Sequence, residues 1–249
     1  MLSYVFCLLR SDRQPDVRRI DEGMPGGRDL RAIAAGQRLW AIVQSVPEAE
    51  YGEDTLARGL QNLDWVGARA VAHERVIESF LAARALLPMQ LFTLFTSDDR
   101  VVQHVRSNGA RIRRILERIE NNVEWGLRLT FDEKATRAQL SKRPVKSGTE
   151  FLARKRDVLD ITRTRLRAAK VSANRVYKSM SRLATAAQRR TSLERAAPGS
   201  RLLLDAAYLV PTAKSRAFRS AARQQTRDLR GGGITVSLTG PWPPYNFIQ

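Results

Sequence analysis

Short apolar runs near the start of the chain predict β-strands. Residues 3–9 are almost entirely aliphatic or aromatic, and residues 30–34 and 38–46 lie on either side of a turn at 35–37. Runs of this length and composition are typical of strands, and the second member of the pair is apolar enough for the centre of a sheet. The polar stretch 11–29, which contains two prolines and a Gly-Gly pair, predicts a loop.

Apolar positions spaced three and four residues apart predict helices in the next segment. A helical pattern starts near Asp54, and Asp64 is the expected cap of a second helix. Ser97 is a strong N-cap for a third helix that reaches about Glu120. The proline-containing run 86–95 between them predicts an edge or irregular strand. The second helix has one apolar face: Trp65, Ala68, Ala72, Val76 and Phe80.

The second half contains the longest helical pattern of the chain, over residues 147–190. A strand at 123–131 and a polar loop at 132–146 precede it. Its heptad repeat favours packing along a seam against another helix or a sheet, and a coiled coil is a further reading. The repeating positions are Leu152, Leu159, Leu166, Ala173, Met180 and Ala187.

After this helix the pattern predicts a strand at 202–210, a helix at 211–229 and a strand at 234–238. If a short strand near 191–195 is counted, the order is strand, helix, strand, strand, helix, strand. That is the split βαβ, or ferredoxin-like, order. We therefore expect an α+β protein with two domains: an N-terminal α+β domain at 1–120 and a ferredoxin-like domain with a long helix at 121–249.

The charge distribution supports this division. The 249 residues carry a formal net charge of +18. Residues 1–120 have 17 Lys and Arg against 16 Asp and Glu, whereas residues 121–249 have 26 against 9. Nearly all of the excess therefore belongs to the second half. A surface of this kind indicates either a nucleic-acid ligand or an acidic protein partner.

The chain offers little recognisable catalytic or metal-binding chemistry. It lacks phosphate-binding glycine motifs, a nucleophile elbow and a zinc-protease motif. Cys7 lies in an apolar run and is interpreted as a core residue, and His73 as a hydrogen-bonded helix residue. Asp98 and Asp99 are explained by the electrostatics of a helix start. We therefore expect no enzyme activity, no cofactor and no metal site. We also expect neither a signal peptide nor a membrane span.

Arginines on the helix at 211–229 form the first candidate binding surface. Their spacing of three and four residues places them on one side, opposite Phe218 and Ala222. Guanidinium groups in such a row can bind carboxylates or phosphates, and a merely solvated face is the alternative. The row has few aromatic residues beside it for stacking on bases, which disfavours nucleic acid. Its members are Arg216, Arg219, Arg223, Arg227 and Arg230.

The uncharged C-terminal segment is the second candidate. It reads Thr-Gly-Pro-Trp-Pro-Pro-Tyr-Asn-Phe-Ile-Gln over residues 239–249. Its prolines enforce an extended path, and Trp242, Tyr245 and Phe247 supply large apolar area. We expect it to dock on its own domain or on a partner.

This segment resembles the end of gas vesicle proteins of the GvpF/GvpL family, which have the pattern T-G-P-W-P-P-Y-x-F. Further family motifs follow in order along nearly the whole chain. They are Trp65 with His73-Glu74, Leu87-Pro88 with Phe92, Glu124-Trp125-Gly126, Ser147-Gly148 with Phe151-Leu152, and Ala207-Tyr208-Leu209-Val210. The chain departs from the family at Met89-Gln90, at Thr93 and at Phe6-Cys7.

The resemblance implies a non-enzymatic accessory or minor structural protein in the cytoplasm and on gas vesicles. It implies binding to the major shell protein, contact with other gas vesicle accessory proteins and a role in assembly. The protein-binding candidates are the arginine row together with Trp242, Tyr245 and Phe247. The alternative that remains open is a basic nucleic-acid-binding protein. F-type and L-type members are not separable from these motifs.

Overall fold

The computed structural model describes residues 1–141, 147–191 and 197–248, which divide into two compact units. The first unit comprises Met1–Val123 together with Trp242–Gln249, and the second comprises Glu124–Pro241. The sequence placed the C-terminal segment in the second domain, whereas contacts in the structure group it with the first. Both units combine helices with a sheet, so the protein is α+β, as predicted.

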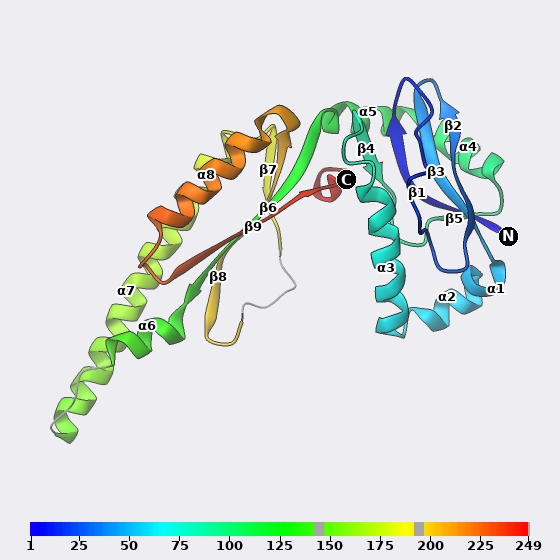
Figure 1. The fold of residues 1–249 in the computed structure, drawn as a ribbon. Helices are drawn as coiled ribbons and strands as arrows, with labels where there is room; N and C mark the ends of the chain where they lie inside the picture. Colours follow the sequence, from blue (N-terminus) through cyan, green and yellow to red (C-terminus); the bar gives the residue numbers. More distant parts are fainter. Residues whose placement is uncertain (142–146, 192–196, 249) are drawn as a thin grey trace. The chain divides into compact units, whose positions relative to one another are not determined.

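The first unit is built on a five-stranded sheet (Figure 1). Four of its strands follow the order β2-β3-β1-β4, and the short fifth strand, β5, also pairs with β1. Its strands are β1 (Leu2–Arg10), β2 (Arg28–Gly36), β3 (Leu39–Val46), β4 (Ala85–Pro88) and β5 (Leu94–Phe95). Its helices are α1 (Glu48–Tyr51), α2 (Glu53–Gly59), α3 (Leu63–Glu78), α4 (Asp98–Ser107) and α5 (Gly109–Ile119).

A β-bulge in the central strand β1 shapes the core beside α3. The register of β1 against β3 shifts between Val5 and Cys7. Tyr4 and Phe6 face the core cluster before the shift, and Cys7 and Leu9 face it afterwards. The extra residue explains why Phe6 and Cys7 share one side although they are neighbours in sequence. Cys7 is fully buried, so its interpretation as a core residue is confirmed.

The second unit has a four-stranded sheet of order β7-β8-β6-β9. Its elements in chain order are β6 (Asn122–Asp132), α6 (Glu133–Leu140), α7 (Gly148–Ser181), β7 (Ala186–Arg189), β8 (Ser200–Pro211), the 3-10 turn η1 (Thr212–Lys214), α8 (Ser215–Asp228) and β9 (Ile234–Trp242). A central β6–β8 pair flanked by β7 and β9 is the split βαβ arrangement that the element order predicts.

The long helix α7 and the helix α8 pack on the same sheet. Tyr208 of β8 contacts Tyr177 of α7 and Phe218 of α8, with ring centroids 6.0 and 5.3 Å apart. Phe218 and Ala222 are the buried residues of α8, as the apolar stripe predicts. In β8, the buried Asp205 carboxylate accepts hydrogen bonds from Arg128 and Arg190 at 2.6 to 2.9 Å.

Several predicted boundaries are wrong, and tertiary pairing explains the largest error. The long helix ends at Ser181, because residues 186–189 instead pair with 206–209 of β8. Ala187 of the heptad row therefore lies in a strand. Ala173 and Met180 are buried as a seam requires, but Leu152 is 65% exposed. The strand considered near 191–195 falls mainly on residues outside the described part of the chain.

Three further differences lie at helix ends. Asn62, not Asp64, caps α3, since its side chain accepts from the backbone amides of Asp64 and Trp65. The helix predicted over 97–120 is divided at Asn108 into α4 and α5, although Ser97 caps its start as expected. Part of the predicted loop 132–146 is the helix α6, capped by Asp132, whose carboxylate accepts from the amide of Ala135 at 2.7 Å.

Candidate functional site

The C-terminal segment is docked on its own unit. After β9 ends at Trp242, Pro243 and Pro244 are buried, and a 3-10 turn, η2 (Tyr245–Phe247), follows. Phe247 is 6% exposed and belongs to the interior, while Trp242 stays 37% exposed. Of the two destinations that the sequence left open, the structure shows docking within the chain.

A hydrogen bond between Tyr245 and Glu74 joins this segment to α3. The Tyr245 hydroxyl donates to Oε2 of Glu74. Burial raises the pKa of Tyr245, and the neighbouring carboxylate raises it further. Burial also raises the pKa of Glu74, while the bond from Tyr245 acts in the opposite direction by stabilising the charged form.

His73, the neighbour of Glu74, is hydrogen-bonded on both sides of its ring. Nδ1 lies 2.7 Å from the Tyr4 hydroxyl, and Nε2 lies 3.2 Å from the carbonyl oxygen of Met89. A carbonyl only accepts, so Nε2 carries the proton and Nδ1 accepts from Tyr4. Burial lowers the pKa of His73 to about 4, so the ring is neutral at physiological pH. This agrees with the sequence interpretation of a hydrogen-bonded helix residue.

The same network holds the segment after β4 in an unusual conformation. The backbone amide of Phe92 donates to the Tyr4 hydroxyl at 3.2 Å. Phe92 has a φ of 64°, a left-handed conformation that is uncommon for a large side chain. Its ring stacks on Trp65 of α3 with centroids 5.4 Å apart. Hydrogen bonding and ring stacking therefore offset the cost of this conformation.

Arg69 completes this face of α3. Its guanidinium lies 3.7 Å from the centroid of the Trp65 ring and 5.3 Å from that of Tyr51. It also approaches the Glu50 carboxylate to 3.7 Å. The Arg69 guanidinium therefore contacts two aromatic rings, one of which, Trp65, also stacks on Phe92.

An open cavity of about 400 Å³ remains beside the docked segment. Its lining includes His73, Glu74, Tyr245, Ile248 and residues 88–91. The polar groups of His73 and Glu74 already have partners, so the cavity offers mainly apolar contact. A nucleophile with a base and a third orienting group is not assembled there.

The arginine row of α8 lies in the second unit and faces solvent. Arg216, Arg219, Arg223 and Arg227 are exposed on α8, opposite the buried Phe218 and Ala222. Arg230 is also exposed, but it lies in the turn after the helix, which ends at Asp228 and not at the predicted 229. Arg227 donates to the side chain of Gln224. Within the described part of the chain, the other four have no hydrogen-bond or ion-pair partner. Their guanidinium groups are therefore available to an external anion.

Exposed apolar side chains on α7 supply a second kind of contact in the same unit. Phe151 and Leu152, at the start of the helix, are 55% and 65% exposed. Ile161 and Val171 are also exposed further along. On the same helix, Arg163 pairs with Asp160 at 3.5 Å, and both side chains are largely exposed. The second unit thus presents both positive charge and apolar area.

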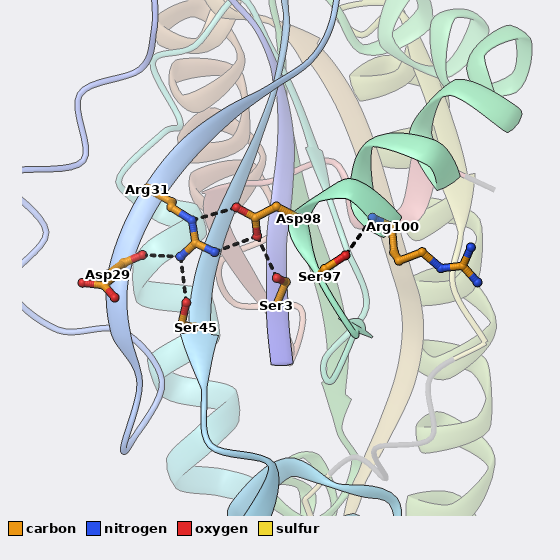
Figure 2. A network of polar contacts seen from close by, with 7 residues as sticks. All are labelled: Ser3, Asp29, Arg31, Ser45, Ser97, Asp98 and Arg100. Carbon is orange, nitrogen blue, oxygen red and sulfur yellow. Dashed lines mark hydrogen bonds and ion pairs between the residues drawn. The ribbon is translucent and has the colours of Figure 1, made fainter. Parts of the chain in front are cut away.

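Asp98 in the first unit is engaged structurally, as Figure 2 shows. Its carboxylate accepts hydrogen bonds from Arg31 at 2.6 and 2.9 Å and from the Ser3 hydroxyl at 2.7 Å. Arg31 in turn donates to Ser45 and to the backbone of Asp29. Burial opposes ionisation of Asp98, but these bonds prevail and lower its pKa. The carboxylate therefore ties the start of α4 to β1 and β2.

Sequence reasoning missed Glu74 as a site residue, although it recognised the His73-Glu74 pair as a motif. Trp65 and the His73-Glu74 pair belong to one motif on α3, and the structure brings Phe92 and Tyr245 to it from two other motifs. The shared family motifs were the signal that pointed to this cluster. Trp242, Tyr245 and Phe247 belong to the first unit, whereas the five arginines belong to the second.

Among the described residues, no helix has the length and apolar character to span a membrane. In the same residues, His, Cys, Asp and Glu side chains do not gather in threes where they could hold a metal ion.

Comparison with known proteins gives a consistent picture. Residues 2–249 match the family model described as gas vesicle synthesis protein GvpL/GvpF. The chain is 30% identical over 259 residues to gas vesicle protein L of Streptomyces sp. (strain CB03234), covering 99% of this chain and 92% of that protein.

Two crystal structures have a similar fold. Gas vesicle protein GvpF from Anabaena sp. PCC7120 matches with a TM-score of 0.69 at 14% identity, over 100% of this chain and 98% of that one. GvpF from Microcystis aeruginosa matches with a TM-score of 0.67 at 13% identity, over 100% and 99%.

Proposed function

Because this chain belongs to the GvpL/GvpF family of gas vesicle synthesis proteins, we propose that it binds the major shell protein of gas vesicles and supports assembly without catalysing a reaction. Family membership across residues 2–249 carries this proposal. It extends the general association with gas vesicles, which membership implies, to a specific partner and role.

The second unit has the surface that such a role requires. A partner that handles a small, hydrophobic shell subunit must cover apolar area reversibly and remain soluble itself. The exposed Phe151 and Leu152 of α7 provide apolar contact, and the arginine row of α8 provides charge. We assign binding of the shell protein, and of acidic groups on other gas vesicle accessory proteins, to these residues.

In this proposal the C-terminal segment mainly stabilises the first unit and does not form the shell-binding surface. Tyr245 joins the segment to α3 and Phe247 is buried, so both act by keeping the first unit intact. Trp242 is exposed at the start of the docked segment and remains a candidate for direct contact with a partner.

Complementation in cells tests the proposed role. In gas vesicle-forming cells that lack this gene, the wild-type chain is expected to restore turbidity that collapses under pressure. Phe151→Gln with Leu152→Gln removes exposed apolar area without creating a cavity, and we expect it to restore less. Full restoration by a chain that lacks both the apolar pair and the charges of Arg219 and Arg223 would contradict the proposal.

A further inference from the structure

The first unit contains a strongly basic hollow that the balanced charge of the N-terminal half conceals. It is an open cavity of about 630 Å³ where the turn between β2 and β3 meets α4 and α5. Five arginines contribute to its lining, and none of the residues that line it is acidic. We call it the basic hollow; its arginines are Arg10, Arg38, Arg84, Arg106 and Arg113.

Three of these arginines have carboxylate partners outside the lining. Arg10 and Arg84 share Glu120, with Nη1 of Arg10 lying 3.2 Å from Oε2. Arg38 pairs with Asp12 at 2.6 Å in a solvated position. The shared Glu120 shows that the guanidinium groups at this edge are already spaced to bind one carboxylate between them.

The other two arginines of the basic hollow are Arg106 and Arg113. They lie on α4 and α5, both side chains are exposed, and neither has a hydrogen-bond or ion-pair partner among the described residues. Both line the hollow. The hollow therefore has two uncompensated positive charges, and this favours an anionic ligand.

The rest of the lining narrows the class of ligand. The partly exposed side chain of Leu39 gives the hollow an apolar contact, Val105 and Leu116 form its buried floor, and no aromatic side chain lines it. Proteins that bind single-stranded nucleic acid stack the bases on aromatic rings, so this lining lacks their main contact. Carboxylates next to an aliphatic side chain would match both the charge and the apolar patch.

We propose that the basic hollow binds a segment of a protein partner in which acidic side chains flank an apolar one. The apolar side chain packs on Leu39, and the carboxylates pair with Arg106 and Arg113. This site belongs to the first unit, so it is separate from the shell-binding surface assigned to the second unit. Either proposal can fail while the other stands.

A labelled peptide of alternating Glu and Leu residues tests this site on the full-length chain. Its binding is followed by fluorescence anisotropy near physiological ionic strength, where weak non-specific attraction is screened. Replacement of Arg106 and Arg113 by Gln removes the two unpaired charges and keeps good helix formers. We expect this double variant to bind about tenfold more weakly.

Arg111 and Arg114 provide a matched control on α5. Both are exposed, and neither lines the hollow. Their replacement by Gln changes the net charge by the same amount, and we expect less than about a twofold effect. Equal weakening by both double variants would overturn the proposal, because it would show general attraction to a basic protein.

Two further arms test the ligand class. Arg106→Lys with Arg113→Lys keeps the charge, so we expect it to retain more binding than the Gln pair. A single-stranded oligonucleotide that binds more tightly than the peptide, and that depends on Arg106 and Arg113, would overturn the assignment to a protein segment. Displacement of the peptide by an equal concentration of inorganic phosphate would overturn it as well.

Discussion

The hydroxyl of Tyr245 donates a hydrogen bond to the carboxylate of Glu74, 171 residues earlier in the chain. This bond fixes the 3-10 turn η2 to α3, beside the ring of His73 and the segment after β4. The C-terminal segment is therefore part of the first unit's structure although β9, which leads to it, is part of the second.

Removal of the Tyr245 hydroxyl is expected to loosen the C-terminal segment. In Tyr245→Phe the ring still packs, but the half-buried Glu74 carboxylate loses a donor. We expect a loss of about 1 kcal/mol in the free energy of unfolding, measured in urea, and faster amide exchange over residues 245–248. Glu74→Gln keeps an acceptor for the hydroxyl and should cost less. Unchanged exchange in Tyr245→Phe would contradict this role of the bond.

His73 is expected to make the stability of the first unit depend on pH. Its pKa is about 4 in the folded chain, below the usual value of about 6.5. The unfolded chain therefore binds this proton more readily, and stability falls as the pH drops from about 6.5 towards 4, by at most about 3 kcal/mol. We expect the difference in unfolding free energy between the wild type and His73→Gln to shrink over this range. A difference that stays constant with pH would contradict a neutral, buried imidazole.

The Arg31–Asp98 pair is expected to stabilise the start of α4. About a third of each side chain is exposed, so we expect Asp98→Asn to cost only about 1 kcal/mol. The bonds from Arg31 and Ser3 outweigh burial and lower the pKa of Asp98. This stabilisation is therefore present above the unfolded pKa of about 4 and is lost as the pH falls further.

Asp99→Asn is the matched control for that measurement. Asp99 is exposed and occupies the same first turn, so it shares the helix-end electrostatics but not the bond to Arg31. Urea unfolding at neutral pH should show a clearly larger loss for Asp98→Asn. Equal losses would mean that the helix end, not the ion pair, accounts for the effect.

Sequence patterns predicted the features that depend on neighbouring residues. The strand around Cys7, the Ser97 cap and the orientation of α8 with Phe218 inward and its arginines outward all follow from local spacing. Each of these features depends on residues close together in the sequence. None requires knowledge of the element that packs against it.

Features that depend on distant partners were not predictable in the same way. The heptad row continues past Ser181 in the sequence, but the helix ends there because β7 pairs with β8. A heptad pattern shows how often apolar residues recur and does not show which element they pack against. Likewise, Glu74 looks like an ordinary helical carboxylate until Tyr245 is placed beside it. The basic hollow was hidden because acidic residues elsewhere balance its charge in the sum for residues 1–120.

Direct binding of the shell protein tests the central claim most closely. Purified shell protein is mixed with the full chain near physiological ionic strength, and the fraction that stays in the supernatant after ultracentrifugation is measured. We expect the wild type and Arg111→Gln with Arg114→Gln to keep the shell protein in solution, and Arg219→Gln with Arg223→Gln to keep markedly less. The claim would be contradicted if the wild type kept no more shell protein in solution than an unrelated basic protein does, or if the α8 pair behaved like the control.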